Sequence, residues 1–332
     1  MIGRDKPRHA ARRFLAAATL IPCWFALWPA SAQAPYPSQA IRFVVPYAAG
    51  GVPDTVARFV GLRLQDRVGQ TVVVENRPGG NGSVAAAAIT AAPADGYTLL
   101  VTDSSMLSVN PLFFKQIAYS PEKDFVPVAL LARAPLFLAI YSDLPITTLQ
   151  EFIEYVKARP GQINYGSSGI GSSHHLTMEA VKAALHLDMT HVPYRGTGQS
   201  VPALLGGHVQ ALFSAYPSLK GAVESNRVRL IANNGAQRSP LAPGVPALAE
   251  FIPGFDLITL IGVYARTGTA PAIIQRIAAE AIMIVKQPDV VPQFAALGIE
   301  PAGEGPEAFS RAIAGEIERV TKVVEGAGLK PE

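Results

Sequence analysis

Three glycine- and serine-rich segments each follow a short run of β-branched residues and precede a helical pattern. They run from Tyr47 to Asp54, from Asn76 to Ser83 and from Gly166 to His174. A fourth, from Tyr194 to Gly198, adds the cation Arg195. In a parallel α/β sheet such junctions gather at the carboxyl ends of the strands, where helix N-termini present free N–H groups. These amides and hydroxyls suit an anion such as a carboxylate, because hydrogen bonds to charged groups contribute about 1.5 to 3 kcal/mol each.

Two other interpretations of these loops have to be weighed. Taken alone, Gly50 and Gly51 could simply turn the chain while Asp54 caps a helix, but the repetition of the pattern favours binding. The segment from Gly80 to Ala85 also fits the dinucleotide pattern GxGxxA, with Asp103 about 20 residues further on. That fingerprint needs a tight turn after the strand, and the loop before Gly82 is too long for one.

Catalytic and metal-binding patterns are missing from the sequence. It contains no GxSxG, HExxH or Walker segment. His174 and His175 are adjacent, so on a helix they point about 100° apart and cannot share a metal ion. We therefore expect no catalytic residue, no cofactor and no metal, and we keep His174 as a candidate ligand contact.

Residues 1–32 have the pattern of an export signal. Five cations and one anion lie in residues 1–13, and an apolar stretch and small residues follow, with cleavage expected after Ala32. The apolar stretch is too short to span a membrane. Twin-arginine export through Arg12 and Arg13, and lipoprotein anchoring at Cys23, remain alternative routes. We expect a periplasmic protein without disulfides, since Cys23 is the only cysteine.

The charge balance argues against a nucleic-acid partner. The chain has 28 Lys and Arg against 25 Asp and Glu, and the basic excess lies in the export segment. The remaining chain is close to neutral and has no basic run.

Beyond the signal, short apolar runs alternate with helical patterns, which is typical of an α/β fold. Helices are expected at 54–68 and 149–159, and an apolar stripe predicts a last helix across 309–324. Strands are expected to begin at Ile41, Thr71, Tyr97, Ile163, Met189, Val209 and Val228. The apolar runs at 129–141 and 257–265 are predicted to be two crossing strands. They would divide the chain into one lobe of residues 35–133 plus 256–332 and a second lobe of residues 134–255.

The chain resembles the extracytoplasmic solute receptors of tripartite tricarboxylate transporters, also called the TctC or Bug family. The resemblance rests on YPSQAIRFVVPYAAGGVPDTVAR, VVVENRPGGNGS, ADGYTLL, NPLFF, INYGSSGIGSSHHL and HVPYRGTGQSVPALLGGHVQALF, in this order. It implies a type II periplasmic-binding-protein fold, with two α/β lobes joined by two crossing strands and closing on a carboxylate. It also implies a membrane permease as partner and a monomeric receptor.

From the loops and the resemblance together we predict the ligand-binding residues. They are Tyr47, Ala48, Ala49, Gly50, Gly51, Asp54, Gly82, Ser83, Ser167, Ser168, Gly169, Gly171, Ser172, Ser173, His174, Arg195, Gly196 and Ser214. The chain departs from the family pattern at two places. It has Phe213-Ser214-Ala215-Tyr216 where the family often has Asp or Asn followed by a small residue, and Leu260-Ile261-Gly262 where the family often has a tryptophan-glycine pair. Both departures concern the ligand and not the fold.

The expected function is capture of a small organic carboxylate for a tripartite transporter, without chemistry on it. Two alternatives stay open. One is a receptor that signals without transport, and the other is an exported α/β enzyme that acts on a carboxylate.

Overall fold

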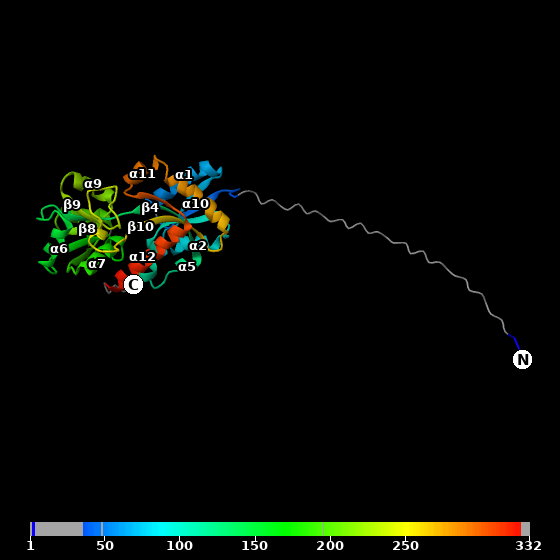
Figure 1. Cartoon of the computed structure of the whole chain (residues 1–332), viewed down its shortest axis with the longest axis horizontal. Helices are drawn as coiled ribbons and strands as arrows, with labels where there is room; N and C mark the ends of the chain where they lie inside the picture. The colour runs from blue at the N-terminus through cyan, green and yellow to red at the C-terminus, as the bar shows by residue number, and fades with distance from the viewer. Residues whose placement is uncertain (1, 4–35, 48, 195, 327–332) are drawn as a thin grey trace. The chain divides into compact units, whose positions relative to one another are not determined.

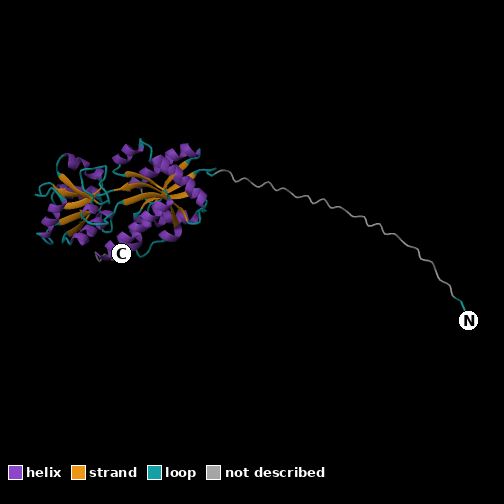
Figure 2. Ribbon diagram, viewed as in Figure 1, coloured by secondary structure: helices purple, strands orange, loops and turns teal. Residues whose placement is uncertain are grey.

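The computed structural model describes residues 2–3, 36–47, 49–194 and 196–326. From Tyr36 onward the chain forms one compact unit, in which helices pack on two separate sheets (Figures 1 and 2). Apart from Ile2 and Gly3, the predicted export signal lies outside the described residues. No helix in the described ranges is both long and apolar enough to cross a membrane.

The first sheet has six strands in the order β11-β4-β10-β3-β1-β2. Strand β1 pairs in parallel with β2 and β3, whereas β10 runs antiparallel to β3 and β4. The strands are β1 (Ile41–Val45), β2 (Val72–Asn76), β3 (Thr98–Asp103), β4 (Phe125–Ala134), β10 (Thr259–Arg266) and β11 (Glu300–Glu304). The helices of this part are α1 (Val52–Val68), α2 (Ser83–Ala91), α3 (Ser105–Ser108), α4 (Asn110–Phe113), α5 (Pro121–Asp124), α10 (Pro271–Val285), α11 (Val290–Ala296) and α12 (Pro306–Gly326), with a 3-10 turn at Gly80–Gly82.

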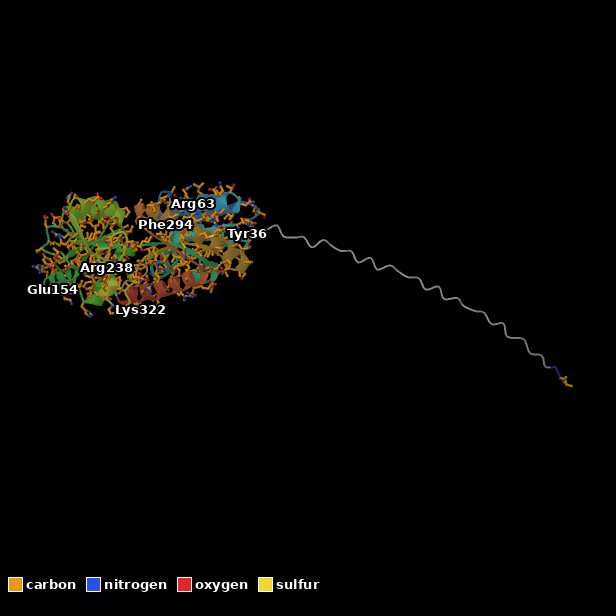
Figure 3. The ribbon with its side chains drawn as sticks, turned by 45° about the horizontal axis from the view of Figure 1, so that its top comes forward. Tyr36, Arg63, Glu154, Arg238, Phe294 and Lys322 are labelled. Carbon is orange, nitrogen blue, oxygen red and sulfur yellow. The ribbon has the colours of Figure 1, made fainter. Side chains whose placement is uncertain are left out.

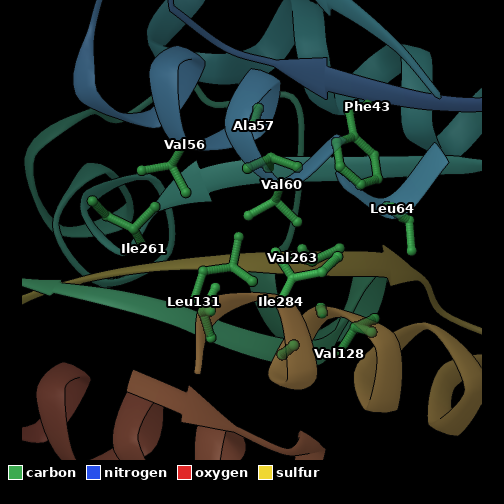
Figure 4. Close-up of a cluster of buried hydrophobic side chains, with 14 of the residues drawn as sticks. Phe43, Val56, Ala57, Val60, Leu64, Val128, Leu131, Ile261, Val263 and Ile284 are labelled. Carbon is green, nitrogen blue, oxygen red and sulfur yellow. The ribbon is translucent and has the colours of Figure 1, made fainter. Parts of the chain in front are cut away.

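Alternation along β1 explains why both faces of the first sheet are covered. Phe43 points to the face where α1 and α10 pack, and it lies in a cluster with Val60 and Ile284 (Figure 4). Val44 points to the opposite face and packs in a cluster that contains Phe309 of α12. Successive side chains of a strand alternate between faces, so an unbroken apolar run such as IRFVV indicates a strand buried on both sides.

The second sheet has five strands in the order β7-β6-β8-β5-β9. They are β5 (Phe137–Tyr141), β6 (Asn164–Ser167), β7 (Thr190–Pro193), β8 (Ala211–Ser214) and β9 (Val228–Asn233). Helices α6 (Leu149–Lys157) and α7 (Ser173–Leu185) bury their apolar residues on one face, and α8 (Thr197–Leu205) and α9 (Tyr216–Glu224) on the other. A capping box at Thr148 and Glu151 fixes the start of α6. A 3-10 turn at Leu248–Glu250 follows β9.

Two chain segments join the sheets. Strand β4 ends at Ala134, Pro135 interrupts the pairing, and β5 begins in the second sheet at Phe137. The chain returns through residues 234–258 into β10. The predicted crossing at residues 129–141 and 257–265 is confirmed, and the type II architecture with it. The exact lobe limits, 35–133 with 256–332 and 134–255, stay a prediction.

Charged side chains such as those of Glu154, Arg238 and Lys322 lie at the surface (Figure 3). Arg63 contacts Asp289 at 2.8 Å, and Arg238 contacts Glu250 at 2.8 Å. Exposed pairs of this kind contribute about 0 to 1 kcal/mol each. The stability of the fold therefore comes mainly from the apolar clusters between helices and sheets.

Candidate functional site

A cavity of about 660 Å³ opens between loops that belong to the two sheets. Polar loop residues form much of its wall, and a group of apolar side chains forms the rest. The lining residues are Pro46, Tyr47, Pro78, Gly79, Gly80, Asn81, Gly82, Asp103, Ser105, Met106, Val109, Asn110, Phe113, Phe114, Ser168, Ile170, Gly171, Ser172, Ser173 and His174. We call this cavity the cleft. Its volume lies within the usual range for small-molecule sites, about 300 to 1,000 Å³.

The loop between β2 and α2 supplies one polar wall of the cleft. Residues Pro78 to Gly82 line it, and α2 begins immediately afterwards at Ser83. Gly82 adopts φ +90°, and a β-carbon there would collide with the side chain of Met106. This position therefore requires glycine, and the loop places the N-terminus of α2 at the cleft, where its free amides attract negative charge.

The facing wall is the loop between β6 and α7. Ser168 and residues Ile170 to His174 line the cleft there, and the Ser172 side chain caps α7 by accepting from the His175 amide. The Ser168 hydroxyl lies 3.0 Å from Nδ1 of His174. Burial lowers the pKa of His174 to about 4, so its ring is neutral at neutral pH. The wall therefore offers neutral donors at a second helix N-terminus.

Stacked rings beneath this loop hold it in place. His191 lies 4.0 Å from His175 and 4.8 Å from Tyr165, measured between ring centroids. Nε2 of His191 lies 2.7 Å from the Ser167 hydroxyl, at the end of β6. Ser167, which we predicted as a ligand-binding residue, is buried and does not line the cleft. Its hydroxyl accepts from the Gly169 amide within the loop.

Asp103 is the acidic residue of the cleft wall and ends β3. Its Oδ1 accepts from the Tyr47 hydroxyl at 2.9 Å and from the Ser105 amide at 3.0 Å. Burial raises the pKa of Asp103, although hydrogen bonds from Tyr47 and Ser105 oppose the rise. Tyr47 is a phenol at neutral pH, because burial raises its pKa well above 10. The tyrosine proton is therefore directed at Asp103.

The structure brings together seven of the predicted site residues. Tyr47, Gly82, Ser168, Gly171, Ser172, Ser173 and His174 all line the cleft. Ala48 and Arg195 lie outside the described residues. The ligand-binding role of all of them stays a prediction.

The other predicted residues do not line the cleft. Ala49, Gly50 and Gly51 lie at the start of α1, where the Gly50 amide donates to Asp54 at 2.9 Å. Ser83 accepts from the Ala118 amide, Gly169 carries the carbonyl that accepts from Ser172, and Gly196 precedes α8. Ser214 is fully buried, and its hydroxyl has no hydrogen-bond partner within the described ranges.

Asp54 acts as an internal brace for the first loop. Although burial raises its pKa, hydrogen bonds from Arg58, the Gly50 amide and Asn76 together lower it below the ordinary value. The same Asn76 side chain donates to the Tyr47 carbonyl at 3.0 Å. Asp54 thus steadies the turn that carries Tyr47 and does not itself line the cleft.

Several lining residues were absent from the sequence prediction. Met106, Val109, Phe113, Phe114 and Ile170 give the cleft its apolar part. The sequence alone predicts them to be core residues, because an apolar residue in a sequence does not distinguish a core position from a binding-site position. Three lining residues, Asn110, Phe113 and Phe114, belong to the NPLFF motif, which was the sequence signal that could have identified them. Within the described residues, no group of three or more His, Cys, Asp and Glu side chains could hold a metal ion.

A buried glutamate lies directly behind the cleft. Glu316 of α12 is 6% exposed and borders a small cavity of about 20 Å³ that shares Ser105 and Ser173 with the cleft. Its Oε1 accepts from the hydroxyls of Ser104 at 2.7 Å and Ser108 at 2.8 Å. Burial raises the pKa of Glu316 to about 7, against the opposing hydrogen bonds from these serines.

Glu316→Gln should make the stability of the protein less dependent on pH. Between the ordinary glutamate pKa of 4.5 and about 7, the folded chain keeps a proton that the unfolded chain releases, so stability falls as pH rises. Urea unfolding at pH 5 and pH 8 measures this effect. The free energy of unfolding of the variant, relative to that of the wild type, should be about 2 to 3 kcal/mol higher at pH 8 than at pH 5. Parallel pH profiles for the two proteins would contradict a raised pKa at Glu316.

Two helix-covered sheets, joined by two chain segments and bordering one cleft, define the class of two-lobed periplasmic solute-binding proteins. A family model described as "Tripartite tricarboxylate transporter family receptor" matches residues 56–329. The chain belongs to this receptor family, as the sequence resemblance predicted.

Similar proteins agree with this assignment. BugT from Bordetella pertussis is 35% identical over 304 residues, covering 91% of this chain and 93% of its own length. The solved structure of Rpa4515 from R. palustris with adipate is 32% identical, has a TM-score of 0.74 and covers 90% of this chain and all of its own. MatC from Rhodopseudomonas palustris with bound malate is 31% identical, has a TM-score of 0.68 and covers 87% of this chain and all of its own.

Proposed function

We propose that this receptor binds a small organic carboxylate in the cleft and holds its headgroup between the N-termini of α2 and α7. The observation that carries the proposal is that both helix starts border the same cavity from opposite walls. Helix N-termini attract anions through their free amides and the helix dipole. The solved relatives with adipate and malate support a carboxylate as the ligand class.

Neutral donors fit a receptor that has to release its cargo. The described lining residues include no Lys or Arg, so the headgroup would meet amides and hydroxyls in place of a fixed cation. Such contacts leave no unpaired protein cation buried when the ligand departs. Binding without chemistry also agrees with the membership of the chain in a receptor family.

Closure of the cleft would occur at the two segments that join the sheets, 134–136 and 234–258. Hinge motions in binding proteins commonly use a few residues at the ends of such elements. In this scheme residues 134–255 form the moving lobe, and an exported, monomeric protein delivers the acid to a membrane permease. A null mutant that keeps uptake of the acid but loses gene induction would favour a sensing role instead.

Native mass spectrometry of freshly purified protein tests the proposal. We expect a small organic acid to remain bound and to be released on denaturation. Calorimetry with that acid should then give one binding site per chain. Failure of the folded protein to bind any member of a panel of mono-, di- and tricarboxylates, hydroxy acids, amino acids and aromatic acids would overturn the proposed ligand class. Catalytic consumption of the acid would favour an enzyme.

A further inference from the structure

The cleft wall contains one acidic side chain among its described residues, that of Asp103, and the proposed headgroup site does not explain its place there. Asp103 lines the cleft, the described lining residues offer no Lys or Arg, and His174 is neutral because burial lowers its pKa to about 4. In its ionised form Asp103 would repel a carboxylate ligand, and no Lys or Arg among the described lining residues would offset that repulsion. A buried carboxylate oxygen that lacks a donor of its own costs free energy, so a ligand that supplies such a donor gains an advantage.

The geometry of Asp103 decides which of its oxygens can meet a ligand. The Tyr47 hydroxyl and the Ser105 amide both donate hydrogen bonds to Oδ1, at 2.9 and 3.0 Å. Two donors on one oxygen fix the orientation of the carboxyl group, and they favour its charged form against the burial that raises its pKa. Oδ2 takes part in neither of these two bonds, so we expect it to be the oxygen that accepts a hydrogen bond from a ligand in the cleft.

The position of Asp103 in the fold supports this role. It ends β3, which lies between β1 and β10 in the first sheet. Strand β1 leads into Tyr47, and the loop that follows β2 leads into α2 at the same edge. Asp103 thus borders the cleft on the same sheet edge as the proposed headgroup site, where it could meet a group close to the ligand carboxylate.

We propose that Asp103 selects carboxylates that also carry a hydrogen-bond donor, either a hydroxyl or an ammonium group, over plain carboxylates of the same length. This inference rests on the proposed function and narrows its substrate class. The apolar residues Met106, Val109 and Phe113 on the cleft wall would then contact the carbon chain of the ligand.

Two matched sets of acids test this selectivity. Succinate, malate and aspartate share four carbons, and glutarate, 2-hydroxyglutarate and glutamate share five. By calorimetry, the wild type should bind the hydroxy or the amino member of a set at least about 10-fold more tightly than the plain member, as expected for one hydrogen bond to a charged group. Whichever of the two is tighter identifies the donor.

Asp103→Asn should invert this preference. The hydrogen bonds from Tyr47 and Ser105 should hold the new amide oxygen at the Oδ1 position, which leaves the NH₂ group facing the cleft. A donor then meets the ligand in place of an acceptor. We expect binding of the hydroxy or amino acid to weaken at least about 10-fold, while the plain dicarboxylate binds as well or more tightly.

Asp289→Asn is the matched control, because Asp289 pairs with Arg63 at the surface and does not line the cleft. In this control, the ratio of the affinity for the hydroxy or amino acid to the affinity for the plain dicarboxylate should equal that of the wild type. An unchanged ratio in Asp103→Asn, or tighter wild-type binding of the plain acids, would overturn the inference and leave the proposed function intact. If the folded wild type binds no carboxylate of either set or of the wider panel, the proposed function fails, and this inference with it.

Discussion

Gly171→Trp is expected to abolish ligand binding while the protein remains folded. A β-carbon at Gly171 would lie 3.3 Å from the ring of Phe113, and both residues line the cleft, so a larger side chain there would take space from the cleft. We expect affinity for the bound acid to fall by more than about 100-fold, which corresponds to about 2.7 kcal/mol or more. In thermal unfolding, the stabilisation that the ligand gives the wild type should disappear.

Gly254→Trp is the matched control for this substitution. Gly171 and Gly254 have nearly the same left-handed backbone, with φ +75° and +77°, so both variants bear a similar strain. Gly254 has nothing within 4 Å of its β-carbon position and does not line the cleft. The control should lose stability but keep its ligand response, and an equal loss of binding in both variants would argue against the cleft.

Asn234→Ala is expected to destabilise the fold by about 2 to 5 kcal/mol. Asn234 is fully buried where the chain leaves the second sheet. Its Oδ1 accepts from the Leu136 amide at 2.8 Å, and its Nδ2 donates to the Leu257 carbonyl at 2.7 Å. The substitution removes the partner of a buried donor, the Leu136 amide, and of a partly buried acceptor, the Leu257 carbonyl, each at a cost of about 1 to 3 kcal/mol.

Urea denaturation measures this loss directly. Asn164→Ala provides a comparison from a strand of the same sheet, because the Asn164 side chain is only half-buried and should cost less than about 1 kcal/mol. A loss below about 1 kcal/mol in Asn234→Ala would show that the two connecting segments do not depend on this amide. Because the amide links both connections, its removal should also loosen the hinge that we propose.

Most of the fold could be predicted from local patterns. The apolar runs at Ile41, Tyr97 and Val228 became β1, β3 and β9, because burial on both faces leaves a continuous apolar sequence. The predicted stripe of α12 is also confirmed, with Phe309 and Val320 buried. Strand β11 was not predicted, because its sequence, EPAGE, has no β-type pattern and forms a strand only by pairing with β4.

The site could be predicted only in part, for a different physical reason. The loops that precede α1 and α2 look equivalent in sequence. In the first loop, however, Asp54 accepts the hydrogen bond of the Gly50 amide, whereas residues 78–82 of the second loop line the cleft. That difference depends on how the loops pack and not on their composition. Likewise, Asp103 appeared in sequence as the acid of a dinucleotide pattern, and only its contact with Tyr47 places it in the cleft wall.

A crystal structure of the purified receptor with its own bound acid would test the central claim most directly. We predict carboxylate oxygens within about 2.7 to 3.1 Å of backbone amides or hydroxyls from the loops before α2 and α7. An acid bound outside the cleft, or one whose headgroup contacts neither of these helix starts, would contradict the account.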